Sequence, residues 1–103
     1  MIDLILLLQA DLDIQIAFSR YEEVQTGRGE VFMQRLEAAL TLLRTHPEIA
    51  PVYAGPYRRM LIHDFPYGIF YQAQPNRIVV AAIVDLRQDP TTIRSKLFGQ
   101  PGA

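Results

Sequence analysis

The spacing of apolar and polar residues changes several times along the first half of the chain, and each change predicts an element. Residues 2–8 are almost uniformly apolar, which is too short for a membrane span and predicts a strand covered on both faces. In residues 10–24, and again from about 30 to 46, apolar residues recur at steps of three and four. Both stretches predict amphipathic helices. The glycine-containing link at 26–29 is short, so the two helices should form an antiparallel hairpin.

The second half of the chain is typical of strands joined by tight turns. Residues 57–71 predict a β-hairpin, because β-branched and aromatic residues flank a corner at 64–68 that contains Pro66 and Gly68. Residues 77–84 are apolar on both faces and predict a central strand. A short helix should follow Asp89, which lies before a proline in the position of an N-cap. Residues 46–56, between these halves, are bounded by prolines and predict an irregular passage.

Taken in order, these elements predict an α+β domain that spans residues 1–103. An N-terminal strand, an antiparallel helical hairpin and three further strands follow one another, with a short helix at the C-terminal end. The helical hairpin should pack on one face of a mainly antiparallel four-stranded sheet, in the order β-α-α-β-β-β.

Composition and charge limit the classes of function. The chain has 103 residues, half of them apolar, with a formal net charge of −1, so attraction to nucleic acid by general positive charge is disfavoured. It contains no cysteine and two histidines, so no metal site and no cofactor are expected. Asp3 stands where a secretory signal would carry basic residues. A cytoplasmic protein is the expectation.

The candidate chemical groups gather on the predicted hairpin and at the end of the last strand. Strand alternation places Arg59 and His63 on one face and Arg58 on the other. The arginines could equally be strand residues whose charged heads are solvated, and a lone histidine is more often structural than catalytic. Asp85 and Arg87 lie two apart at the end of the central strand, where they could pair with each other or with neighbours.

Several short motifs, in order, resemble one protein family. They are Ala10-x-x-Asp13-Ile14-x-x-Ala17-x-x-x-Tyr21-Glu22, Gly27-x-Gly29-x-x-Phe32, His46-Pro47, Tyr57-Arg58-Arg59, Phe65-Pro66-Tyr67-Gly68-Ile69-Phe70-Tyr71 and Asp85-x-Arg87-x-Asp89-Pro90. The ordered set covers nearly the whole chain and resembles the RelE/ParE toxin superfamily of type II toxin–antitoxin systems. The resemblance implies a small growth-inhibiting toxin, neutralised by a partly disordered antitoxin that is encoded beside it.

The resemblance leaves three functions open. The preferred one is a ParE-like inhibitor of DNA gyrase, with a toxic surface formed by Arg58, Arg59, Asp85 and Arg87. The second is a RelE-like endoribonuclease, which cuts mRNA on the ribosome without a metal and would use Arg59, His63, Tyr71 and Arg87. It ranks lower because no tyrosine follows Tyr71 and because the Asp85 carboxylate would repel a phosphate. The third is a non-toxic member that only binds an antitoxin.

The antitoxin is the expected partner in all three cases. A disordered segment that folds on binding needs a long apolar surface, which the helical pair and an exposed sheet edge would offer. The candidate residues are Phe32, Leu36, Leu40, Ile49, Val52 and Tyr53. Membrane association and direct sequence-specific binding to DNA are not expected.

Overall fold

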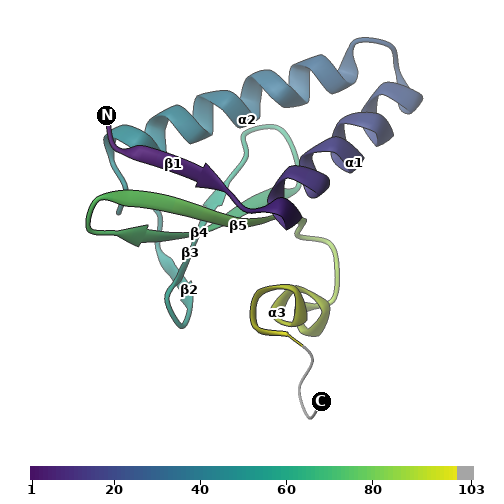
Figure 1. Cartoon of the computed structure of the whole chain (residues 1–103). Helices are drawn as coiled ribbons and strands as arrows, with labels where there is room; N and C mark the ends of the chain where they lie inside the picture. Colours follow the sequence, from purple (N-terminus) through teal and green to yellow (C-terminus); the bar gives the residue numbers. More distant parts are fainter. Residues whose placement is uncertain (100–103) are drawn as a thin grey trace.

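The computed structural model describes residues 1–99, in which a five-stranded mixed sheet is flanked by three helices (Figure 1). The strands lie in the order β1-β5-β4-β3-β2. The elements are β1 (Asp3–Leu6), α1 (Leu8–Val24), α2 (Arg28–Thr45), β2 (Val52–Ala54), β3 (Tyr57–Leu61), β4 (Tyr67–Gln74), β5 (Arg77–Asp85) and α3 (Pro90–Phe98).

The predicted α+β fold is confirmed, and β2 adds a fifth strand to it. β1 pairs in parallel with β5, whereas the other neighbours pair antiparallel. β2 comes from the passage predicted to be irregular, and it pairs with β3 over only three residues, with a shift in register. Pro51 and Pro56 flank it. Because proline has no N–H to donate, these two residues keep the strand short.

The main core lies between the helical hairpin and one face of the sheet. Phe32, Leu36 and Leu43 of α2 are at most 1 % exposed and pack with Ile69 and Tyr71 of β4. The two helices approach closely at Gly29, where an added Cβ would lie 2.8 Å from the Glu22 Cγ atom. The three- and four-residue apolar spacing of both helices is therefore explained by burial against one surface.

A smaller apolar cluster lies on the opposite face of the sheet, beneath α3. Ile93 and Leu97 of this helix pack on Phe70, Ala82 and Val84. The predicted cap is present, since the Asp89 carboxylate accepts a hydrogen bond of 2.8 Å from the Thr91 backbone N–H. The sheet is thus covered on both faces, which explains why β5 is apolar along both of its sides.

The expectation that residues 2–8 are covered on both faces is wrong. β1 is an edge strand, and Ile5, Leu6, Leu7 and Leu8 are 39, 37, 45 and 73 % exposed. The strand is also shorter than predicted, because α1 already begins at Leu8. An apolar run therefore identified a strand here but did not reveal how much of it is buried.

An irregularity between β4 and β5 changes which residues share a face. Phe70 pairs with Ala82, but the next residue, Tyr71, pairs with Val80, so Ala81 is an extra residue on β5. This β-bulge breaks the strict alternation assumed from the sequence. As a result Val80 and Ile83 both face the helical hairpin.

Candidate functional site

Arg58 of β3 and Tyr71 of β4 are paired residues on neighbouring strands. Both bind the backbone of the segment that follows α2. The Arg58 Nη1 atom donates to the carbonyl oxygens of Ala50 (2.7 Å) and Glu48 (3.3 Å), and the Tyr71 hydroxyl donates to that of Pro47 (2.8 Å). Tyr71 is fully buried, and this burial raises the pKa of its hydroxyl. Both side chains therefore fasten residues 47–50 to the sheet, and the tyrosine is closed to a substrate in this structure.

Arg59 lies on the other face of the sheet, on the same side as α3. Its guanidinium carbon is 5.3 Å from the centre of the Tyr53 ring, which packs edge-on against Phe70. Its aliphatic stem passes over Gly68, where an added Cβ would lie 3.2 Å from the Arg59 Cγ atom. The aromatic ring and the glycine together hold this arginine against the sheet.

Asp85 and Arg87 form an ion pair with two parallel contacts at the end of β5. Nη2 of Arg87 lies 2.7 Å from Oδ2 of Asp85, and Nε lies 3.0 Å from Oδ1. Hydrogen bonding to Arg87 holds the pKa of the Asp85 carboxyl below its usual range, and the same contact raises the pKa of Arg87. The Asp85 side chain is 13 % exposed, that of Arg87 71 %. The sequence left open whether Asp85 and Arg87 pair with each other or with neighbours, and in the structure they pair with each other.

His63 lies in the turn between β3 and β4 and is largely exposed. Its Nε2 atom is 3.4 Å from the carboxylate of Asp64, which also binds Arg35 of α2 at 3.1 Å. Asp64 has a positive φ of 69°, a conformation that aspartate tolerates in tight turns. The His63 side chain is 81 % exposed, so this group belongs to a turn at the protein surface.

The four residues predicted for RNA cleavage do not come together. Arg59 lies on the α3 face, whereas Arg87 is held by Asp85, which lines a small cleft with Arg20 and Tyr67 on the helical-hairpin face. Tyr71 is buried and His63 projects from a turn. Arg87 follows the end of β5, and its ion pair with Asp85 holds it near Tyr21 of α1, away from Arg59.

The six residues predicted to bind the antitoxin differ in their exposure. Phe32 and Leu36 are at most 1 % exposed, because they fill the core between α2 and the sheet. In this structure their side chains are therefore closed to a partner, and their role in antitoxin binding stays a prediction. Ile49 and Val52 are 51 and 60 % exposed, whereas Leu40 and Tyr53 are half-buried. The accessible members therefore come from residues 49–52 and not from the centre of the helical pair.

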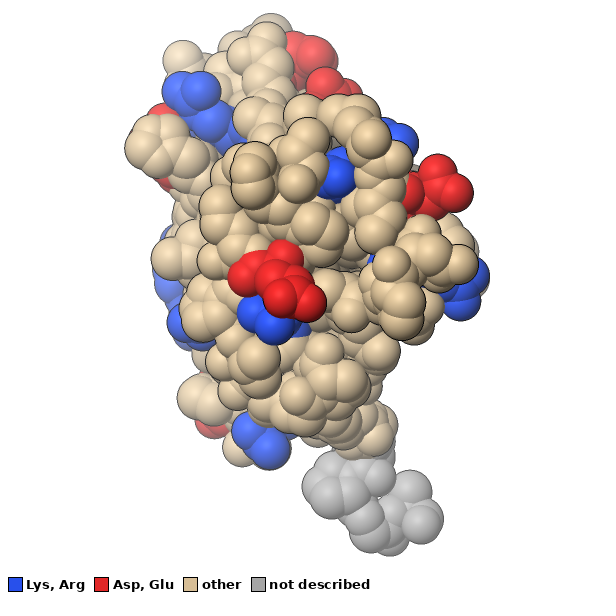
Figure 2. Space-filling model, turned by 90° about the vertical axis from the view of Figure 1, so that its left-hand side faces the viewer, with Lys and Arg blue, Asp and Glu red and all other residues tan. Residues whose placement is uncertain are grey.

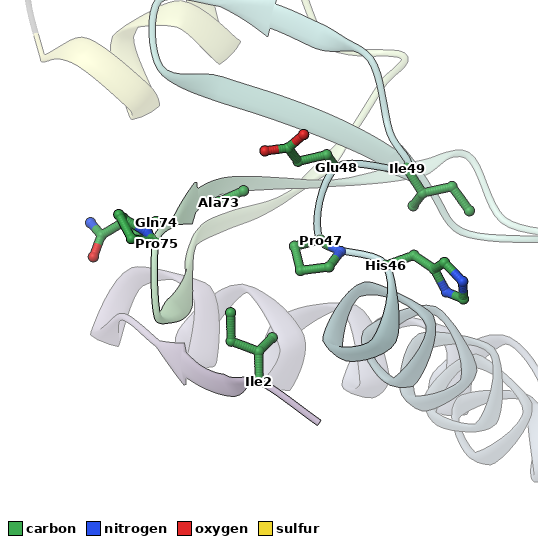
Figure 3. Close-up of a pocket in the computed structure, with 8 residues that line it drawn as sticks. All are labelled: Ile2, His46, Pro47, Glu48, Ile49, Ala73, Gln74 and Pro75. Atoms are coloured by element: carbon green, nitrogen blue, oxygen red, sulfur yellow. The ribbon is translucent and has the colours of Figure 1, made fainter.

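An open groove of about 600 Å³ lies beside Ile49 (Figure 3). Three parts of the chain form it: the segment after α2, the turn between β4 and β5, and the start of the chain. The lining residues are Ile2, His46, Pro47, Glu48, Ile49, Ala73, Gln74 and Pro75. Uncharged residues cover most of this side of the molecule, which carries the N-terminus and the β4–β5 turn, with acidic and basic groups side by side near its centre (Figure 2). No spacing in the sequence predicts this groove, because its parts are distant in the chain.

The described residues offer no preformed site for a metal ion. Within residues 1–99, no three histidine, aspartate or glutamate side chains converge as metal ligands would. No helix in this part of the chain is both long enough and apolar enough to cross a bilayer.

Comparison with known proteins adds two findings. The model of a family described as "ParE toxin of type II toxin-antitoxin system, parDE" matches residues 4–90. Among solved structures, one described as "Chromosomal ParDE TA system from P. aeruginosa" superposes with a TM-score of 0.74 at 13 % sequence identity. The match covers 84 % of this chain and 97 % of that chain, and at this identity it shows a shared fold. No curated protein matches the sequence.

Proposed function

Because the chain belongs to the ParE toxin family of type II toxin–antitoxin systems, we propose that it stops growth by binding a protein target, DNA gyrase, and does not cut RNA. A cognate ParD antitoxin is its partner. The proposal has two parts, the mode of action and the surface that acts, and each has its own test.

The observation that carries the first part is the separation of the candidate catalytic groups. Metal-free RNA cleavage needs a base, an acid and cations placed around one phosphate. Here the Tyr71 hydroxyl is buried and donates to a carbonyl oxygen. Arg59 lies against Tyr53 on the α3 face of the sheet, whereas Arg87 is held by Asp85 beyond the end of β5. Inhibition by binding requires only a surface that contacts the target protein, and the separation of the catalytic candidates supports that mode of action.

We assign the toxic surface to the end of β5 on the helical-hairpin face. Arg87 is the most exposed of the four residues predicted to form the toxic surface. Its two contacts to Asp85 fix its orientation. A guanidinium held in this way loses little conformational freedom on binding, which favours affinity. Arg58 is a weaker candidate because its guanidinium already binds two carbonyl groups.

The mode of action can be tested by inducing the chain without its antitoxin in a bacterium. Plasmid supercoiling and primer extension on abundant mRNAs are then measured in the same cultures. We expect relaxed or cleaved DNA and intact mRNAs. Cuts in phase with codons would refute the proposal in favour of an endoribonuclease, and unhindered growth with normal protein levels would indicate a non-toxic binding protein.

The acting surface can be tested with single arginine substitutions, because Arg59 and Arg87 report on different parts of the molecule. We expect Arg87→Ala to abolish toxicity and Arg59→Ala to leave most of it. Arg77→Ala is the matched control, since this exposed arginine lies at the β4–β5 turn and binds only Gln74 among the described residues. The reverse order of the two variants would move the toxic surface to the α3 face.

A further inference from the structure

A small polar cleft lies where the end of β5 meets α1 and α3. Its volume is about 90 Å³. This is several times the roughly 10–15 Å³ that one water molecule needs, but well below the roughly 300–1,000 Å³ of pockets for drug-sized ligands. The cleft therefore suits a ligand of a few non-hydrogen atoms. Its lining residues are Asp13, Ile16, Arg20, Tyr67, Ile83, Asp85, Gln88 and Lys96, which include none of the four residues predicted for RNA cleavage.

Both carboxylates of the cleft are already bound by donors of the protein. Asp13 accepts from the Ile83 backbone N–H at 3.0 Å and from the Lys96 Nζ atom at 3.2 Å. Asp85 accepts the two side-chain contacts of Arg87 and a further bond of 2.9 Å from its backbone N–H. A ligand of the cleft would therefore bind through donors and not through these acceptors.

The remaining donors of the cleft are free. Within residues 1–99, the Arg20 guanidinium, the Gln88 amide and the Tyr67 hydroxyl make no hydrogen bond to the protein. Tyr67 is the most informative of the three, because the residue is only 5 % exposed. No enclosed polar side-chain atom in this part of the chain lacks a partner, so the Tyr67 hydroxyl opens into the cleft that the residue lines. A nearly buried hydroxyl of this kind is stabilised when a ligand or water accepts its hydrogen bond.

The charges around the cleft favour a negative ligand. Arg20, Lys96 and Arg87 lie in or beside it, and the last two are each paired with one of its carboxylates, at 3.2 and 2.7 Å. The charge of Arg20 has no such partner among the described residues. Hydrogen bonding to Arg87 is the main cause of the lowered pKa of Asp85, and the charge of Arg20 lowers this pKa further. The Arg20 guanidinium is therefore close enough to act on the cleft.

We propose that this cleft binds a small oxyanion, either phosphate or a short carboxylate. The Arg20 guanidinium supplies positive charge and paired N–H donors, which match the oxygens of both kinds of anion. The Tyr67 hydroxyl donates a further hydrogen bond from the interior, and the Gln88 amide donates from the segment after β5. Because the bound anion contacts α1, β4 and that segment together, it stabilises the folded chain. The inference is independent of the proposed mode of action.

The test titrates the purified chain with sodium phosphate and, separately, with sodium acetate, at an ionic strength held constant with sodium chloride. The Tm and the NMR shifts of the Tyr67 and Gln88 backbone N–H groups report binding. We expect saturable shifts and a rise in Tm with at least one of the two anions, and the tighter one identifies the kind of oxyanion. If neither anion has an effect beyond that of chloride, the proposal is wrong.

Tyr67→Phe is the sharpest variant, because it removes only a hydroxyl that the described part of the protein does not bind. We expect it to melt as the unsubstituted chain does and to bind the anion about tenfold more weakly, the effect of one hydrogen bond to a charged group. Tyr71→Phe is its matched control on the same strand, since that hydroxyl is bound to Pro47 outside the cleft. Arg20→Gln should also lose at least about tenfold in affinity, whereas Arg77→Gln, an exposed arginine outside the cleft, should lose none.

Two outcomes would refute the cleft as the binding site. One is an unchanged affinity in both Tyr67→Phe and Arg20→Gln. The other is an equal loss in Arg20→Gln and Arg77→Gln, which would show only general attraction between the anion and positive charge. Thermal melting without added anion shows that each variant is folded, and the exposed Arg20 keeps the test decisive if Tyr67→Phe is not.

Discussion

Asp13 is the only buried charged side chain among residues 1–99, and its replacement tests how three elements are joined. Its Oδ2 atom accepts a hydrogen bond of 3.0 Å from the Ile83 backbone N–H, in the protein interior. Its Oδ1 atom accepts bonds from Gln9 at 2.8 Å and from Lys96 of α3 at 3.2 Å. One carboxylate of α1 thus contacts both β5 and the C-terminal helix.

The position of Asp13 follows from the different lengths of two neighbouring strands. The last bond from the β1 side is that of Leu7 to Val80, whereas β5 continues to Asp85. The Ile83 N–H lies beyond the end of β1, and a buried N–H without an acceptor is costly. The carboxylate of Asp13 therefore takes the place of a strand backbone at this point.

Three substitutions separate the contributions of the Asp13 bonds to stability. Asp13→Ala leaves the Ile83 N–H without an acceptor, which costs about 1–3 kcal/mol. The lost pair with Lys96, whose side chain is 31 % exposed, adds at most about 1 kcal/mol. Asp13→Asn keeps an acceptor oxygen and should cost about half of the total, and Lys96→Met at most about 1 kcal/mol.

Urea unfolding followed by circular dichroism measures these differences, and thermal melting checks them, because 1 kcal/mol lowers the Tm of a domain of this size by about 4–8 °C. The expected order of destabilisation is Asp13→Ala, then Asp13→Asn, then Lys96→Met. If Asp13→Ala were no more destabilising than Lys96→Met, the bond to Ile83 would contribute nothing and the reasoning would fail.

Three further predictions concern the helix crossing, the buried tyrosine and the ion pair. Gly29→Ala should destabilise the fold by about 1–3 kcal/mol in urea unfolding, because the new Cβ would lie 2.9 Å from the Phe18 carbonyl oxygen. Tyr71→Phe should cost about 1 kcal/mol of stability through the lost bond to Pro47 and leave toxicity unchanged in a growth assay; loss of toxicity in the folded variant would favour a nuclease. Because the pKa of Asp85 is lowered in the fold, its ionised carboxylate stabilises the protein above the ordinary aspartate pKa. This stabilisation is lost as the pH falls below about 4, so Asp85→Asn should flatten the acid side of a Tm-against-pH profile.

Local spacing of residues determined the elements and their order. Residue spacing reflects which face of an element is buried. The steps of three and four therefore predicted both helices, and the apolar stretch predicted β5. Glycines and prolines marked the turns for the same reason, because they restrict or free the backbone where they stand. The ordered motifs also indicated the superfamily that the family match bears out.

Only the tertiary structure decided which side chains are available for function. Arg58 and Tyr71 looked like functional groups, but they bind carbonyls of residues 47–50, which no spacing in the sequence reveals. The bulge at Ala81 and the end of β1 at Leu6 likewise depend on pairing between distant segments. Register and burial are set by neighbours far away in the chain, whereas periodicity is set within each element. The sequence therefore determined the fold class, and the packed structure decided which surfaces can bind a partner.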